Sequence, residues 1–104
     1  MAAINNKMQR SFFLGFIKVH ILHHAKKECI YGLWLIEELK RHGYNLSPGT
    51  LYPILHKLED ENLLKSYSEL ADGKKRKYYR ITPKGVKALE QSKKKIFELI
   101  KEVM

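Results

Sequence analysis

The chain has almost no cysteine and no glycine-rich phosphate-binding loop, and both absences narrow what it can do. Its single cysteine, Cys29, cannot form an internal disulfide and excludes a zinc site built on several thiolates. One unpaired thiol is typical of a reducing compartment, so we expect a cytoplasmic protein. Because Cys29 has no adjacent catalytic base and no catalytic motif occurs, we expect neither enzymatic activity nor a cofactor.

Long hydrophobic runs are also missing. The longest apolar stretch, Phe12 to Leu22, is interrupted by Lys18 and His20. It is shorter than the roughly 20 apolar residues that a membrane-spanning helix needs. The N-terminal region lacks the clean apolar core and cleavage site of a signal peptide. We therefore expect no association with a membrane.

Acidic residues are few relative to basic ones. The chain of 104 residues has 20 Lys and Arg against 11 Asp and Glu, which gives a formal net charge of +9. Such a surplus favours polyanionic partners, nucleic acid first and anionic membrane second. The hydrophobic share of 44% and the aromatic share of 11% are ordinary for one folded domain.

The spacing of apolar residues predicts three helices before the first turn-rich segment. The first is expected from about Asn6 to Ala25, with an apolar face so broad that it needs both the core and a second subunit. The second, about Tyr31 to His42, should end at Gly43 in a left-handed cap. The third should begin with Ser47 as capping residue and Pro48 at its first position. Its buried face is predicted to carry Leu51, Ile54, Leu55 and Leu58.

A hairpin follows the third helix. Asp72-Gly73 lies between two alternating segments, 64–70 and 75–81, which is a strong hairpin pattern. A two-residue turn there gives three cross-strand pairs: Glu69 with Arg76, Tyr67 with Tyr78, and Leu64 with Ile81. Opposite charges and paired aromatic rings favour this register in an antiparallel pair.

Thr82-Pro83 repeats the cap-then-proline pattern and opens a last helix that reaches about Met104. Its apolar positions are spaced by three and four residues, as in a heptad seam. A helix of this length spans about 33 Å, which is too long for so small a body to cover. We therefore expect a homodimer whose interface combines residues of the first and last helices: Phe12, Phe16, Val86, Leu89, Ile96, Ile100 and Val103.

This order of elements predicts an α+β, mainly α fold of the winged helix-turn-helix type. Three helices and a two-stranded wing would occupy residues 1–82, and a C-terminal dimerisation helix residues 83–104, as one structural unit. In this fold the third helix lies in the major groove of DNA and the wing touches the flanking backbone. The fold and the positive charge together predict a DNA-binding transcriptional regulator.

The predicted DNA contacts come from the hairpin and from the exposed face of the third helix. Basic residues crowd the hairpin tip, where they can neutralise phosphates. The third helix exposes no Arg, Asn or Gln, the residues that make bidentate base contacts, so DNA shape and half-site spacing should supply much of the specificity. The residues expected to contact DNA on these grounds are Gly49, Thr50, Tyr52, His56, Lys57, Lys74, Lys75, Arg76 and Lys77.

Two motifs in this arrangement resemble the PadR family of transcriptional regulators. The first is Tyr31-Gly32 followed by Ser-Pro-Gly-Thr-Leu-Tyr-Pro-Ile-Leu at 47–55 and Leu-Glu at 58–59; the second is Arg-Lys-Tyr-Tyr-Arg-Ile-Thr at 76–82 with Gly85. The similarity covers roughly Phe16 to Leu89, and the single C-terminal helix is similar to the smaller PadR subfamily. The resemblance implies a homodimer that binds a palindromic operator, usually represses, and is released by a small molecule. It further implies that Tyr31, Ser47, Thr50, Tyr52 and the wing residues Gly73 to Lys77 contact DNA.

Two alternatives stay open. His20, His23 and His24 put two imidazoles on one helical face, so a metal-responsive winged-helix sensor is possible, although the motif contains no neighbouring carboxylate or cysteine and we assign no metal to the chain. A winged helix can also dock onto protein, in which case binding would depend weakly on salt. An effector pocket, if one forms, is expected around Phe12, Phe16, Trp34 and Phe97.

Overall fold

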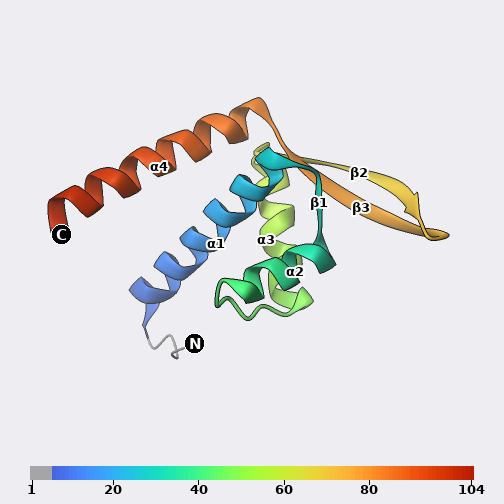
Figure 1. Cartoon of the computed structure of the whole chain (residues 1–104), viewed down its shortest axis with the longest axis horizontal. Coiled ribbons are helices and arrows are strands. Elements are labelled where there is room, and N and C mark those ends of the chain that lie inside the picture. The colour runs from blue at the N-terminus through green and yellow to red at the C-terminus, as the bar shows by residue number, and fades with distance from the viewer. Residues whose placement is uncertain (1–5) are drawn as a thin grey trace.

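The structure is a computed structural model of the chain and describes residues 6–104. Its elements are α1 (Lys7–Lys27), β1 (Ile30–Tyr31), α2 (Gly32–Arg41), α3 (Pro48–Asp60), β2 (Leu64–Ala71), β3 (Lys74–Ile81) and α4 (Pro83–Val103). The first three helices pack together, the β2–β3 hairpin projects from one side, and α4 runs out on the other side (Figure 1). This confirms the predicted mainly helical α+β fold. Within the described residues, no helix combines the length and the apolar character needed to cross a bilayer.

The sheet has three strands in the order β1-β3-β2, so a short strand that was not predicted joins the two-stranded wing formed by β2 and β3. The extra strand consists of Ile30 and Tyr31, which pair with Tyr79 and Tyr78 of β3. Two residues are too few to show the alternation by which a strand is recognised. The apolar spacing therefore predicts a helix from about Tyr31, where the structure has the end of a strand. The short strand ties the base of the wing to the first residue of α2.

The hairpin has the predicted register, with Leu64 opposite Ile81, Tyr67 opposite Tyr78 and Glu69 opposite Arg76. Asp72 and Gly73 have φ values of 52° and 77°, as a two-residue turn with positive φ at both positions requires. Because successive side chains of a strand alternate between its faces, β3 directs Tyr79 into the core and Tyr78 to the other face.

The core lies where α1, α2 and α3 meet the base of the sheet. The buried face of α3 is the predicted one, and α1 buries only the half of its broad apolar face around Ile17 and Ile21. Phe12 and Phe16 stay exposed on its other half. Leu89 of α4, assigned from its heptad position to the dimer interface, is fully buried within the single chain. Spacing alone cannot distinguish a residue that packs on its own core from one that faces a partner. The exposed apolar residues of α4 lie beyond Leu89.

Two helix starts that look alike in sequence differ in the structure. Ser47 stands at the N-cap position of α3, but its side chain accepts no backbone hydrogen bond, and its Oγ lies 3.3 Å from Thr50 Oγ1. The expected side-chain cap is therefore absent at Ser47. At the start of α4, the Thr82 hydroxyl accepts from the Gly85 amide at 2.9 Å and donates to the Asn62 carbonyl at 2.6 Å. Thr82 thereby joins α4 to the end of α3, where Asn62 has a left-handed conformation with φ 63°.

The substitution Thr82→Ala should lower the free energy of unfolding by about 1–2 kcal/mol, because it removes a helix cap and a partner of the Asn62 carbonyl. Thr82→Ser keeps the hydroxyl and should retain most of the stability. Ser47→Ala is the matched control and should change the stability by about 0.5 kcal/mol or less, since no cap is lost. Urea denaturation measures all three; equal losses for Thr82→Ala and Ser47→Ala would contradict the assignment.

Candidate nucleic-acid interface

One part of the candidate site is the exposed face of α3. Four leucine and isoleucine side chains hold this helix to the core by its opposite face. The helical period therefore turns the polar side outward, and its N-terminal end is a favourable place for a phosphate. The predicted contact residues on this face are all exposed: Ser47, Gly49, Thr50, Tyr52, His56 and Lys57.

The second part is the cationic end of the wing. Lys74 and Lys75 are exposed beside the turn, and the side chain of Arg76 is held against an aromatic ring. The guanidinium carbon of Arg76 lies 4.1 Å from the centroid of the Tyr31 ring, within the range of a cation–π interaction. Tyr31 in turn meets Tyr78 edge-on, with ring centroids 5.6 Å apart. The short strand β1 thus supplies the ring that orients Arg76.

Lys77 lies on the opposite face of β3 from Arg76, and its charge is partly neutralised. Its Nζ is 3.7 Å from Glu59 Oε1 of α3. Glu59 also accepts hydrogen bonds from the Ser66 hydroxyl and from the Ser66 amide. The hydroxyl hydrogen bond and the charge of Lys77 outweigh the effect of burial and lower the pKa of Glu59. The wing cations are therefore not equivalent, and Lys77 is less available to phosphate than Lys74 or Lys75.

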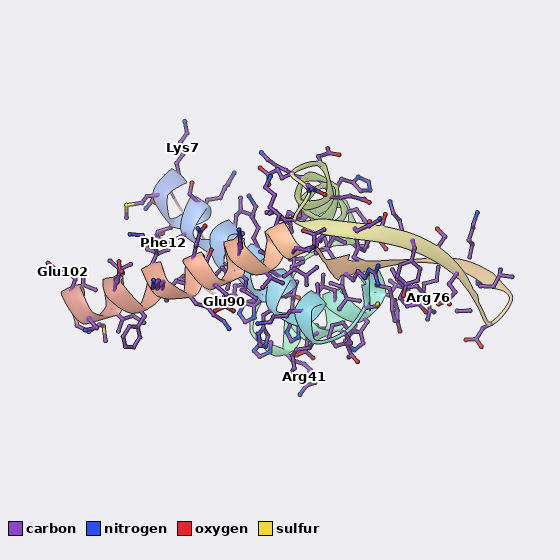
Figure 2. All side chains as sticks on the ribbon, turned by 90° about the horizontal axis from the view of Figure 1, so that it is seen from above. Lys7, Phe12, Arg41, Arg76, Glu90 and Glu102 are labelled. Atoms are coloured by element: carbon purple, nitrogen blue, oxygen red, sulfur yellow. The ribbon has the colours of Figure 1, made fainter. Side chains whose placement is uncertain are left out.

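A hollow of about 250 Å³ joins the two parts of the site. It is lined by Tyr31, Gly32, Leu33, Tyr52 and the wing residues 74–77. Gly32 is buried, and a Cβ built on it would lie 2.7 Å from Tyr52 Cζ, so the absence of a side chain lets the Tyr52 ring cross the start of α2. The hollow brings the Tyr31-Gly32 pair next to Tyr52 and the wing, although the two motifs lie far apart in sequence. Arg76 lies at the wing end of the molecule and Glu102 at the opposite end (Figure 2).

Of the four residues predicted to form an effector pocket, Phe12 and Phe16 lie together, whereas Trp34 and Phe97 lie elsewhere. Phe12 and Phe16 stack with centroids 5.5 Å apart and line a separate hollow with Ile96, between α1 and α4. Trp34 packs edge-on against His24 instead, and Phe97 is exposed next to Lys101.

The histidines of α1 are arranged differently from the prediction. His20 and His24 lie together on one side of α1, as expected, but the third imidazole beside them is His42, which follows α2. His23 is exposed and does not belong to this group. Sequence spacing could not find His42, because its proximity depends on how α2 packs on α1.

The residues of this surface fall within a segment that is shared with a known protein family. Residues 21–91 match the sequence pattern that defines the transcriptional regulator PadR-like family. The chain belongs to this family. Over 95 residues it is 47% identical to the transcriptional regulator Rv3488 of Mycobacterium tuberculosis, a match that covers 91% of this chain and 89% of the relative.

Solved structures of PadR proteins have the same fold. The PadR family transcriptional regulator from Eggerthella lenta is 31% identical with a TM-score of 0.81, over 92% of this chain and 85% of that one. A PadR-like transcriptional regulator from Bacillus cereus is 34% identical with a TM-score of 0.78, over 86% and 88% of the two chains. The PadR chain described here is therefore a DNA-binding transcriptional regulator of winged-helix fold and not an enzyme.

Gly32→Ala should lower the free energy of unfolding by about 1–3 kcal/mol, because the added methyl group overlaps the Tyr52 ring. In a Tyr52→Ala background the same change should have little effect, since the ring is gone. Chemical denaturation of the wild type, both single variants and the double variant measures this coupling. The same loss in both backgrounds would show that Tyr52 does not require glycine at position 32.

Proposed function

We propose that this PadR protein is a homodimeric transcriptional repressor that acts in the cytoplasm and binds a palindromic operator. The observation that carries the proposal is the hollow shared by Tyr31, Tyr52 and the wing cations, because it makes one continuous surface from α3 and the wing. On this surface α3 enters the major groove and Lys74 and Lys75 meet the flanking phosphates. Since α3 exposes no residue suited to bidentate base contacts, DNA shape contributes much of the specificity.

The apolar surface that a single chain leaves exposed supports the proposal of a homodimer. Phe12 and Phe16 of α1 are 49% and 40% exposed, and Ile100 and Val103 of α4 are 50% and 67% exposed. The C-terminal half of α4 runs away from the body of the molecule (Figure 1). Exposed apolar residues gathered on two helices in this way mark an interaction site, and their burial is worth about 25 cal/mol per Å². A partner's α1 and α4 would cover these residues, with α4 (83–104) as the dimerisation helix.

The dimer would set the distance between the two α3 helices. Palindromic half-sites lie about 34 Å apart along one face of DNA, one helical turn. The hollow between α1 and α4, of about 350 Å³ and lined by Phe12, Phe16 and Ile96, is the place for a small-molecule effector. A molecule bound there would change the angle of α4, and with it the distance between the α3 helices, so that the operator is released.

Replacing Lys74 and Lys75 with alanine should reduce the slope of log affinity against log salt by about two for each protomer, because two phosphate contacts are lost. Fluorescence anisotropy with DNA from upstream of the protein's own gene, in the presence of nonspecific competitor, measures the slope. The matched control removes the same charge from exposed positions of α4, with Lys87→Ala and Lys94→Ala, and should leave the slope unchanged.

Two outcomes would contradict this use of the wing. An equal fall in slope for both pairs would mean that net charge, and not the wing, determines binding. Partner binding by the wild type that hardly depends on salt would instead favour the protein-docking alternative.

Ile100→Glu should convert the dimer to single chains, because it places a charge in the apolar seam. Sedimentation velocity should give the wild type twice the mass of one chain and the variant the mass of one chain. Ile100 is exposed in the single chain, so the variant should stay folded. Lys94→Glu, about 120° around α4 from Ile100, is the control and should remain dimeric. A monomeric wild type or a dimeric Ile100→Glu variant would refute this interface.

A further inference from the structure

Three imidazoles from two helices meet where α1 packs on α2. His20 and His24 are one turn apart on α1, and His42 directly follows the last residue of α2. Their ligating nitrogens all lie within 4.8 Å of one another. The His20 and His42 rings have centroids 5.0 Å apart, and the His24 and His42 rings 6.3 Å. This spacing puts three imidazole nitrogens around one point.

Glu38, one turn before His42 on α2, adds a carboxylate to the group. Its Oε2 lies 3.2 Å from His42 Nε2 and 3.7 Å from His24 Nε2, and its side chain is only 15% exposed. Its other oxygen, Oε1, is 3.2 Å from Arg41 Nη1. Arg41 therefore holds one carboxylate oxygen and leaves the second directed at the imidazoles, as the outer partners of metal-binding side chains do.

His24 Nε2 is buried without a hydrogen-bond partner among the described residues. Its distance of 3.7 Å to Glu38 is too long for a hydrogen bond. A neutral imidazole has the free lone pair that a metal ion needs. The His24 nitrogen thus lies near a carboxylate without a hydrogen bond to it.

We propose that His20, His24, His42 and Glu38 form a binding site for one divalent transition-metal ion per chain. Three nitrogens and one carboxylate oxygen make a four-ligand set suited to Zn²⁺ or Co²⁺, whereas Ca²⁺ and Mg²⁺ prefer oxygen alone. Tetrahedral ligands at bond lengths of about 2.0–2.1 Å lie about 3.3 Å apart. The Glu38–His42 pair already has this spacing, and the farthest nitrogens must close by up to about 1.5 Å through side-chain rotation.

An open hollow beside the site gives an ion access to it. The hollow is lined by His24, Glu38, Trp34, Lys27 and Glu28. Trp34 is the chain's single tryptophan, and its ring centroid lies 5.5 Å from that of His24. Lys27 and Arg41 add positive charge nearby, which opposes a cation, so the ligand set must supply the affinity. The position of Trp34 makes its fluorescence a direct report on the site.

The site would join the helix-turn-helix to the rest of the chain. His20 and His24 belong to α1, whereas Glu38 and His42 belong to α2 or its end, so a bound ion fixes the C-terminal end of α2 to α1. The metal site itself is independent of the proposed function. Its effect on DNA binding rests on that function, because it requires that α2 and α3 act together as a helix-turn-helix on DNA.

Titration of tag-free protein with CoCl₂ tests the site, since an open-shell Co²⁺ ion close to Trp34 should quench its fluorescence. We expect saturation at one ion per chain, and recovery of the fluorescence when ZnCl₂ displaces Co²⁺. His42→Gln should weaken Co²⁺ binding by more than about tenfold, because changes that merely neighbour metal ligands already cost that much. His23→Gln, an exposed imidazole on the same helix, is the matched control and should bind like the wild type.

Glu38→Gln, which keeps the shape of the side chain, is the second variant and should also weaken binding. Circular dichroism without metal verifies that each variant is folded. Absence of saturable binding by the wild type would overturn the proposal. A Co²⁺ affinity of folded His42→Gln or of folded Glu38→Gln equal to that of the wild type would also overturn it. So would a loss of Co²⁺ affinity in His23→Gln equal to that in His42→Gln.

A separate titration with DNA, with and without ZnCl₂, tests the link to regulation. Zn²⁺ should change the DNA affinity of the wild type by at least about fivefold and leave that of His42→Gln unchanged. If the ion binds and DNA affinity does not change, the metal site stands and the regulatory link fails. If the protein binds the ion but no DNA, the proposed function fails while the metal site stands.

Discussion

β3 is hydrogen-bonded along both edges, to β1 and to β2, and this pairing positions the wing relative to the helices. The alternation of its side chains sends Tyr79 into the core and Tyr78 to the opposite face, where Tyr31 orients Arg76. Tyr31 immediately precedes α2, and Gly32 admits the Tyr52 ring of α3. One strand pairing therefore brings the wing cations and the exposed face of α3 to the same surface. A hairpin without β1 would lack the Tyr31 ring against which Arg76 lies.

The same strand carries the attachment of α4. Thr82 follows β3 directly, caps α4 and bonds to the Asn62 carbonyl at the end of α3. Gly85 packs so closely that a Cβ on it would overlap the Leu63 carbonyl and lie 2.7 Å from Ile81 Cγ1. The start of α4 is thus fixed to the DNA-binding part, while its far end leaves the body (Figure 1). In the proposed dimer, this fixed start would let α4 transmit a change at its exposed apolar end to α3.

Sequence periodicity predicts those parts of the fold that repeat. The buried face of α3 and the register of the hairpin follow from spacing of 3.6 and 2 residues, and both are confirmed. The strand at Ile30 and Tyr31 is too short to show a period. Ser47 and Thr82 look equivalent in sequence, yet only Thr82 finds a backbone amide. The His24–His42 contact depends on the packing of two helices, and no local pattern contains it.

The central claim is that α3 and the wing form one DNA-binding surface. The most direct test is a titration of isotopically labelled protein with operator DNA, in which nuclear magnetic resonance follows the chemical shifts of the backbone amides. The account predicts that the largest shifts fall in three segments, 47–57, 73–77 and the residues around Tyr31, and that amides near His20 and His42 move little. Shifts concentrated on α1 or the far end of α4, with the wing and α3 unperturbed, would contradict the account.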